Sequence, residues 1–418
     1  MVLELGELRS TYRDLCDAIL TNPRTGLPAW SATLAPGDLL KRPIISVATE
    51  TLEPSISWLD RNANVVGIIN DFRLNETFGA HRCLATSQMA DLHRENPTAI
   101  FINSTVEGDA QNHFNIAAAQ SAIPTLSLLH FHRLLRLIDG ITIPIRPLGL
   151  LEVCDVLSYF DSSIELAADS ARVEKHLRDH YSKITLYGLL MYRLTSDSVW
   201  HRRVSVGRFM QPFGLDSYIF NQRYFDLSET EFFVDGGAYR GDTLNVFARS
   251  VSDAFEKIHA FEPDERNFTY LQQFVADRFG ATQTNVKCHQ AGIWEKSGRV
   301  RFCSLDSGAS PATSSHFQYD EDSESIEGVA VVSLDDCLDG EAPSLIKLEI
   351  EGSELAALKG ARQTIVRHRP KIAVAAYHRP RDLTTLLDCM LELDAGYEFG
   401  LAHHRDSIST TVYYCVPS

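Results

Sequence analysis

Basic residues are scarce in this sequence. Its 418 residues include 39 Lys and Arg against 55 Asp and Glu, which leaves a formal net charge of −16 at pH 7. Duplex nucleic acid and anionic membranes both attract proteins through a positively charged face. The acidic balance therefore argues against nucleic acid or a membrane surface as the main partner.

Long apolar runs are also missing. No stretch approaches the roughly 18 consecutive apolar residues of a membrane-spanning helix. The first seven residues, MVLELGE, are acidic and lack the apolar core of a signal peptide. We therefore expect a cytoplasmic protein, and its length and ordinary composition are sufficient for two or three domains.

Paired cysteines are absent. The eight cysteines stand singly along the chain, at Cys16, Cys83, Cys154, Cys288, Cys303, Cys337, Cys389 and Cys415. Without a Cys-x-x-Cys pair, a zinc site built from cysteine is disfavoured. The spacing indicates reduced thiols in an intracellular protein.

Residues 1–145 predict a small Rossmann-like α/β domain. Its parallel strands are expected at 44–47, 65–69 and 99–103. Asp71 follows the second strand, where an acid could contact a nucleotide ribose. The turn after the first strand, 48–51, contains no glycine and carries Glu50. We therefore expect a domain used for packing or partner contact, with a nucleotide site as the alternative.

Residues 146–230 predict a mostly helical linker. Apolar side chains recur at roughly helical spacing between Tyr159 and Leu194. An aromatic-rich stretch follows, at 209–225. Its side chains could wall a substrate pocket, but we expect them to pack in a core.

A strand, a glycine turn and the start of a helix follow one another from Phe232 to Thr243, which reads FFVDGGAYRGDT. Glycines let the backbone approach a ligand, and the start of a helix offers N–H groups without intrahelical partners. The pattern predicts a cofactor site. Its expected contact residues are Asp235, Gly236, Gly237, Ala238, Tyr239, Gly241 and Thr243.

The next strand, 257–261, ends at Glu262, 21 residues beyond Gly241. An acid at this position can accept hydrogen bonds from ribose hydroxyls, so the sequence predicts a nucleoside. Pro263 follows directly. The turn after a third strand contains Ala291 and Gly292, where an adenine ring would lie against the backbone.

Both NAD and S-adenosylmethionine fit this geometry. Asp235 stands before the glycines, where a carboxylate would repel a pyrophosphate and attract the ammonium group of S-adenosylmethionine. We therefore favour S-adenosylmethionine, and a nicotinamide-dependent oxidoreductase is the alternative.

Two further strands, 344–350 and 371–376, end at candidate functional residues. The first carries Glu349 and Glu351 at its end, and the second is followed by His378. In open α/β sheets, ligands bind at the carboxyl ends of strands. Two last strands, 397–402 and 410–416, predict the terminal antiparallel hairpin that class I methyltransferases have and dehydrogenase domains lack.

Three motifs resemble those of the FkbM-type S-adenosylmethionine-dependent methyltransferases. The sequence VDGGAYRG at 234–241 fits the family's Asp-x-Gly-Ala-x-x-Gly loop, and FEP at 261–263 fits its Phe-Glu-Pro. The stretch IKLEIEGSEL at 346–355 is similar to Ile-Lys-x-Asp-x-Glu-Gly-x-Glu, with Glu349 in place of the aspartate. Near the end, Ala402 stands where the family's arginine is expected.

The resemblance covers about 231–418 and implies a class I fold and methyl transfer. In this family the acceptor is usually a hydroxyl oxygen on a sugar, a glycan or another small molecule. The expected protein thus has three parts: an amino-terminal Rossmann-like domain (1–145), a helical linker (146–230) and a methyltransferase domain (231–418). Two α/β domains also leave room for a homodimer.

Transfer to a hydroxyl needs a group that removes its proton. The candidates are His378, His403, Glu351 and Glu349, and we expect His378 to act because a histidine titrates near pH 7. Three alternatives stay open. Glu351 could cap the next helix, Glu349 could bind a divalent metal together with the two histidines, and the domain could be a non-catalytic cofactor-binding scaffold.

Overall fold

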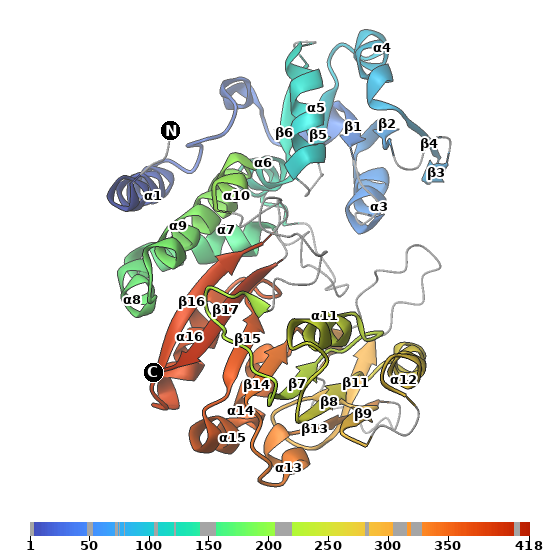
Figure 1. The fold of residues 1–418 in the computed structure, drawn as a ribbon. Helices are drawn as coiled ribbons and strands as arrows, with labels where there is room; N and C mark the ends of the chain where they lie inside the picture. The colour runs from blue at the N-terminus through green and yellow to red at the C-terminus, as the bar shows by residue number, and fades with distance from the viewer. Residues whose placement is uncertain are drawn as a thin grey trace.

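The computed structural model describes residues 4–47, 53–71, 74, 76–78, 80–103, 108–120, 123–142, 156–204, 220–280, 284–303, 316–318, 328–404 and 410–418. Within these ranges, Figure 1 shows two large sheets at opposite ends of the molecule, with helices of the middle segment between them. The expected 48–51 turn and most of the 209–225 aromatic stretch lie outside the described residues.

The amino-terminal sheet has six strands in the described ranges, in the order β3-β4-β2-β1-β5-β6. Their bounds are β1 (Pro43–Val47), β2 (Asn64–Ile69), β3 (Thr77–Phe78), β4 (His81–Leu84), β5 (Ile100–Asn103) and β6 (Thr125–Ser127). All neighbours pair in parallel except β3 and β4. The three expected strands are confirmed, and β3, β4 and β6 extend the sheet at its edges.

Helices cover both faces of this sheet. They are α2 (Asp38–Lys41), α3 (Glu53–Asn62), α4 (Met89–Glu95), α5 (Gly108–Gln120) and α6 (Leu128–Leu134), with the short turns η1 (Ala29–Thr33), η2 (Thr86–Gln88) and η3 (Leu135–Asp139). Ile44 packs in a core with α6, whereas Ile45 packs in another with α4 and α5. A strand buried on both faces explains the continuous apolar run in the sequence.

The middle segment is helical, as expected. It contains α7 (Val156–Glu165), η5 (Leu166–Ala168), α8 (Ser170–His176), α9 (His180–Thr195) and α10 (Val199–Val204). The first helix of the chain, α1 (Leu5–Thr21), packs on α9, and the rings of Tyr12 and Tyr187 lie 5.7 Å apart. Figure 1 shows α7 and α9 between the amino-terminal sheet and the strands β16 and β17.

The carboxy-terminal domain contains a sheet of seven described strands, in the order β16-β17-β15-β14-β7-β8-β9. Their bounds are β7 (Phe232–Gly236), β8 (Lys257–Phe261), β9 (Val286–His289), β14 (Leu345–Leu348), β15 (Lys371–Ala375), β16 (Tyr397–His403) and β17 (Thr411–Pro417). Only β17 runs antiparallel to its neighbours, β15 and β16. This arrangement confirms the class I fold with a terminal hairpin.

Helices also cover both faces of the second sheet. They are α11 (Asp242–Ser250), α12 (Glu265–Phe279), α13 (Leu334–Leu338), α14 (Glu354–Gly360), α15 (Arg362–His368) and α16 (Asp382–Glu392). Phe232 and Val234 of β7 lie in one core with α13 to α16, whereas Phe233 lies in another with α11 and α12. Alternate side chains of a strand point to opposite faces, so β7 fixes both layers.

A smaller sheet adjoins this domain. Its described strands follow the order β10-β13-β11-β12, with bounds β10 (Gly292–Ile293), β11 (Gly298–Cys303), β12 (His316–Gln318) and β13 (Val329–Val332). The sequence did not predict it. The described cysteine side chains, Cys16, Cys83, Cys288, Cys337, Cys389 and Cys415, are free thiols. In the part of the chain that the structure describes, no helix combines the length and apolarity needed to cross a membrane.

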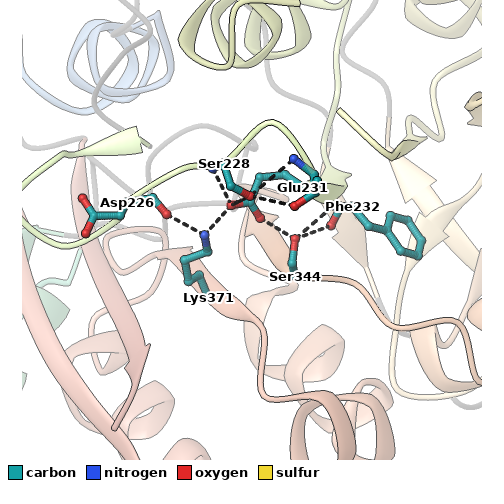
Figure 2. A network of polar contacts seen from close by, with 7 residues as sticks. Asp226, Ser228, Glu231, Phe232, Ser344 and Lys371 are labelled. Carbon is teal, nitrogen blue, oxygen red and sulfur yellow. Dashed lines mark hydrogen bonds and ion pairs between the residues drawn. The ribbon is translucent and has the colours of Figure 1, made fainter. Parts of the chain in front are cut away.

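A polar network fastens the amino ends of three strands, as Figure 2 shows. Glu231, at the start of β7, is 1% exposed and lies 2.5 Å from Nζ of Lys371 in β15. Ser344, before β14, donates its hydroxyl to the same carboxylate. Lys371 also donates to the Asp226 carbonyl at 2.7 Å. The network joins the segment that enters the domain to the centre of the sheet.

Candidate functional site

The glycine turn after β7 lies directly against the chain that follows β14. Gly237 has a φ of +78°, and a Cβ there would lie 2.0 Å from the Glu349 carbonyl oxygen. Gly241 has a φ of +91°, and a Cβ there would lie 2.2 Å from the Phe274 ring of α12. Both positions therefore need glycine for conformation and for space.

The backbone N–H groups of this turn donate hydrogen bonds to residues at the end of β8. Gly237 and Ala238 donate to the Phe261 carbonyl at 3.1 and 3.0 Å, and Tyr239 donates to Oε2 of Glu262 at 2.9 Å. These hydrogen bonds join the ends of β7 and β8, and the N–H groups that we expected to face a ligand belong to the start of α11. Gly241 then occupies the N-cap of α11, where no side chain caps the first turn.

Asp235 is fully buried and already has a cationic partner. Nζ of Lys347, 2% exposed, lies 3.0 Å from its Oδ1 and donates to the Gly237 carbonyl at 2.7 Å. Burial raises the pKa of Asp235, and the nearby ammonium opposes that shift. The charge of Asp235 is therefore already balanced by Lys347, and the expected attraction of Asp235 for a ligand's ammonium group stays a prediction. The expectation that Lys347 pairs with an acid is confirmed.

Glu262 lies at the end of β8, as the sequence predicted, and it is 6% exposed. One oxygen accepts the Tyr239 N–H and the other accepts the Asp264 N–H at 2.9 Å. Burial raises the pKa of Glu262 to about 7. Each carboxylate oxygen keeps a second lone pair, so the side chain can also accept hydrogen bonds from two ribose hydroxyls.

The connection after β9 reaches the same turn. A Cβ on Gly236 would lie 2.8 Å from Cδ1 of Ile293, which ends β10. Ala291 and Gly292 precede Ile293 and are buried, and Gly292 pairs with Val331 of β13. The expected adenine contact thus lies in a strand beside the glycine turn. Thr243 is buried in the first turn of α11. Pro263 directly follows Glu262.

Glu349 and Glu351 lie side by side after β14. Oε1 of Glu349 accepts the Tyr377 hydroxyl at 2.8 Å, and its backbone N–H donates to the Gly236 carbonyl at 3.2 Å. Glu351 has a φ of +56°, uncommon for a residue with a side chain. Its side chain is 27% exposed, and burial raises its pKa to about 7.

His378 is enclosed by two of the acids that follow β14. Its Nδ1 lies 2.8 Å from Oε1 of Glu354, and its Nε2 lies 3.5 Å from Oε2 of Glu351. Burial lowers the pKa of His378, but the charges of Glu354 and Glu351 raise it more, to about 10. The two carboxylates favour the protonated imidazole, which makes His378 a poorer general base than a free histidine, and its expected catalytic role stays a prediction.

Glu354 contacts the candidate site residues, although sequence reasoning did not single it out. It is 1% exposed, binds His378 and also accepts the Ile350 N–H at 2.9 Å. In the sequence, the only indication was its position as the second acid of residues 351–354, which read EGSE. Glu354, rather than Glu351, binds a backbone N–H next to α14, which corrects the capping alternative.

His403 ends β16, in the terminal hairpin. It is fully buried, its Nδ1 lies 3.0 Å from the Thr411 hydroxyl, and its ring lies 4.5 Å from that of His201 in α10. Its expected catalytic role stays a prediction. Within the described ranges, no group of three or more His, Cys, Asp or Glu side chains is arranged to hold a metal ion. The metal alternative through Glu349, His378 and His403 therefore lacks structural support.

Asp71, which follows β2 in the amino-terminal sheet, also has hydrogen-bond partners within the protein. Asp71 accepts the backbone N–H of Thr86 at 2.8 Å and its hydroxyl at 2.5 Å. The carboxylate thus fixes the turn after β4. This contact favours the packing interpretation of that domain over a nucleotide site.

Comparison with known proteins agrees with this geometry. Residues 235–399 match the family model of the methyltransferase FkbM domain. The crystal structure of methyltransferase FkbM from Methylobacillus flagellatus KT is 24% identical, covers 99% of this chain over 100% of its own length, and gives a TM-score of 0.77. The shared fold therefore extends over nearly the whole chain. No curated protein matches the sequence.

Two more distant structures match about half of the chain. An rRNA methylase from Streptococcus thermophilus is 15% identical, covers 46% of this chain and 90% of its own, and has a TM-score of 0.30. Fibrillarin from Aeropyrum pernix, with natively bound S-adenosyl-L-methionine, is 13% identical, covers 48% of this chain and 73% of its own, and has a TM-score of 0.29.

Proposed function

We propose that this chain, whose residues 235–399 form a methyltransferase FkbM domain, uses S-adenosylmethionine to methylate a hydroxyl oxygen. The acceptor class is a sugar, a glycan or another small molecule. The observation that carries the proposal is the position of Glu262, at the end of β8 and bonded to the glycine turn. A ribose-binding acid and a glycine turn at one sheet edge suit an adenosyl ligand.

The residues of this edge fit the cofactor. Glu262 would accept the ribose hydroxyls, and the absence of a Cβ at Gly237 lets the turn lie directly against the Glu349 carbonyl. Ala291 and Gly292 would lie along the adenine. When bound, S-adenosylmethionine supplies an electrophilic methyl group on its sulfonium sulfur. The remaining chemistry concerns the acceptor hydroxyl and the groups that handle its proton.

Glu351 is the residue that we assign as the general base. Its carboxylate is partly exposed and its pKa is raised to about 7, close to the value that suits a base at neutral pH. The imidazolium of His378, 3.5 Å away, holds this carboxylate in place. Glu351 would take the hydroxyl proton of the acceptor, which makes the acceptor oxygen a better nucleophile. His378 keeps its own proton throughout.

Transfer of a radiolabelled methyl group tests the proposal. S-Adenosylmethionine labelled in the methyl group is incubated with a panel of sugars, glycans and small alcohols, and O-methyl products are counted. We expect stoichiometric formation of methylated product and S-adenosylhomocysteine with the wild type. Binding of the cofactor without transfer to any acceptor would instead support the non-catalytic scaffold.

A further inference from the structure

Three side chains from outside the methyltransferase domain bind the loop that carries His378. The hydroxyl of Tyr159 donates to the Tyr377 carbonyl at 2.8 Å. Nη1 of Arg193 donates to the Pro380 carbonyl at 3.2 Å, and the Ser162 hydroxyl lies 3.0 Å from that carbonyl and 3.0 Å from the Tyr159 carbonyl of its own helix. Helices α7 and α9, which Figure 1 shows beside the last strands, thus hold both ends of the 377–380 loop.

Tyr159 and Arg193 also support each other. The Arg193 guanidinium lies over the Tyr159 ring, 4.9 Å from its centroid. Burial lowers the pKa of Arg193, so its charge is held in a poorly solvated position. Its hydrogen bond to the Pro380 carbonyl is therefore a contact that the side chain needs.

The loop borders a cavity of about 230 Å³, and Ser162, Arg193 and Pro380 are among its lining residues. Beside this cavity α7, α9 and α16 pack in one core, which includes Phe160, Leu190 and Leu387. The three donors therefore add hydrogen bonds to the loop at the edge of that core.

The same loop is joined to the residues that surround Glu351. Nε of Arg379 donates to the Gly352 carbonyl at 2.6 Å, and the Arg379 N–H donates to Oδ2 of Asp382 at 2.8 Å. His378 itself contacts Glu351 and Glu354. A displacement of the 377–380 loop would therefore move the imidazolium and the proposed base together.

We propose that Tyr159, Ser162 and Arg193 are positioning residues for methyl transfer. Through the carbonyls of Tyr377 and Pro380, the helical segment sets the place of His378 beside Glu351. The catalytic importance of this positioning rests on the proposed function, because Glu351 is the base only if the domain transfers a methyl group. A misplacement of about 1 Å at a reacting group can cost about 10²-fold in rate.

The test follows the protonation of His378 directly. Histidine is labelled with ¹⁵N, the imidazole of His378 is assigned with the His378→Gln variant, and its titration midpoint is measured by NMR in the full chain. The charged groups that act on the ring are Glu354, Glu351 and Asp382, and Arg379 acts on Asp382 in turn. The variant is the double change Tyr159→Phe and Ser162→Ala, which removes two donors and little volume.

We expect the midpoint of His378 in this variant to fall by about one pH unit or more, because the imidazolium loses its close contacts with Glu354 and Glu351. Tyr397→Phe is the matched control. Its hydroxyl donates to the Pro370 carbonyl, also at 2.8 Å, at the other end of β15. The control should leave the midpoint unchanged, and an unchanged midpoint in the double variant would overturn the proposal.

A single change protects the test against a double variant that fails to fold. Ser162→Ala should lower the midpoint by a smaller amount, whereas Ser163→Ala, whose hydroxyl bonds its own helix at the Tyr159 carbonyl, should not. S-Adenosylhomocysteine binding is measured on the same samples. Absent binding in the wild type would contradict the proposed function, while the NMR shift still decides whether α7 and α9 position His378.

Discussion

Burial and neighbouring charges decide which groups at the sheet edge carry a proton. The residue types alone favour His378 as the base, with His403, Glu351 and Glu349 as the other candidates. In the structure, the charges of Glu354 and Glu351 raise the pKa of His378 to about 10, and burial raises the pKa of Glu351 to about 7. These shifts are the reason why we propose Glu351, rather than His378, as the base.

Cofactor binding should depend on pH through Glu262. The pKa of this carboxyl is raised to about 7, and only the ionised form can accept two ribose hydroxyls. Binding stabilises the ionised form, so affinity for S-adenosylhomocysteine should fall as the pH drops below about 7, approaching tenfold per pH unit. Calorimetric titrations between pH 5 and 8 measure this. The Glu262→Gln variant should bind more weakly and without this pH dependence, and the same slope in both proteins would assign the effect to another group.

Glu351→Gln should remove the base. We expect kcat to fall by about 10²- to 10⁴-fold, with little change in affinity for S-adenosylhomocysteine. In the wild type, kcat should rise with pH and level off above about 7, because the carboxylate must be ionised. That inflection should vanish in the variant. If it persists there, the base is another residue.

Local motifs predicted part of the site, and long-range contacts determined the rest. Gly237, Gly241 and Glu262 follow from a short pattern, because each acts through its own backbone or strand end. The pairing of Asp235 with Lys347 joins two neighbouring strands from distant parts of the chain. The sequence named both residues but could not place the ammonium between the acid and the turn.

At the scale of elements, the glycine turn is the most constrained segment. Gly237→Ala would place a Cβ 2.0 Å from the Glu349 carbonyl oxygen at a φ of +78°. We expect a loss of about 1–3 kcal/mol in the free energy of unfolding and a loss of cofactor binding. Gly298→Ala is the control, since no atom lies within 4 Å of its added Cβ. Thermal unfolding and calorimetry measure both effects, and equal behaviour of the two variants would contradict this account of the turn.

Central strands were predictable and edge strands were not. Strands such as β1 and β7 are buried on both faces and begin as apolar runs. By contrast, β4 reads His-Arg-Cys-Leu and β6 has three residues, Thr-Leu-Ser. Their strand conformation depends on pairing with β2 and β5, which a local pattern does not reveal.

At the scale of the whole molecule, the Glu231 network joins the incoming segment to the sheet (Figure 2). Burial raises the pKa of Glu231, but hydrogen bonds from Lys371 and Ser344 outweigh it and leave the pKa below its ordinary value. Glu231→Ala would leave Lys371 without its carboxylate, so we expect a loss of about 3 kcal/mol in the free energy of unfolding. Glu229→Ala, at an exposed position two residues earlier, should change it by less than about 0.5 kcal/mol.

The pH dependence of stability gives a second check on this network. A depressed pKa in the folded state stabilises the protein above the unfolded-state value of about 4.3, and this contribution is lost as the pH falls through the folded value. The free energy of unfolding should therefore decline more steeply below about pH 4.5 in the wild type than in Glu231→Ala. Parallel curves for the two proteins would contradict the assignment.

The arrangement of the three predicted parts depends on contacts between distant helices. The sequence grouped residues 1–145 together, but α1 packs on α9. It described 146–230 as a linker, whereas α7 and α9 share a core with the methyltransferase domain and bind its 377–380 loop. Amphipathic spacing shows that a helix has a buried face, but the partner of that face is decided by the tertiary fold.

Calorimetric titration of S-adenosylmethionine, S-adenosylhomocysteine and NAD into the wild type, Glu262→Ala and Glu265→Ala tests the central claim most directly. We predict binding of the two adenosyl ligands in preference to NAD. The loss of hydrogen bonds to Glu262 should weaken it by about 2–3 kcal/mol, or about 30- to 150-fold. Glu265 is exposed three residues further on and should have no effect. Preference for NAD, or no binding of any of the three ligands, would contradict the methyltransferase account.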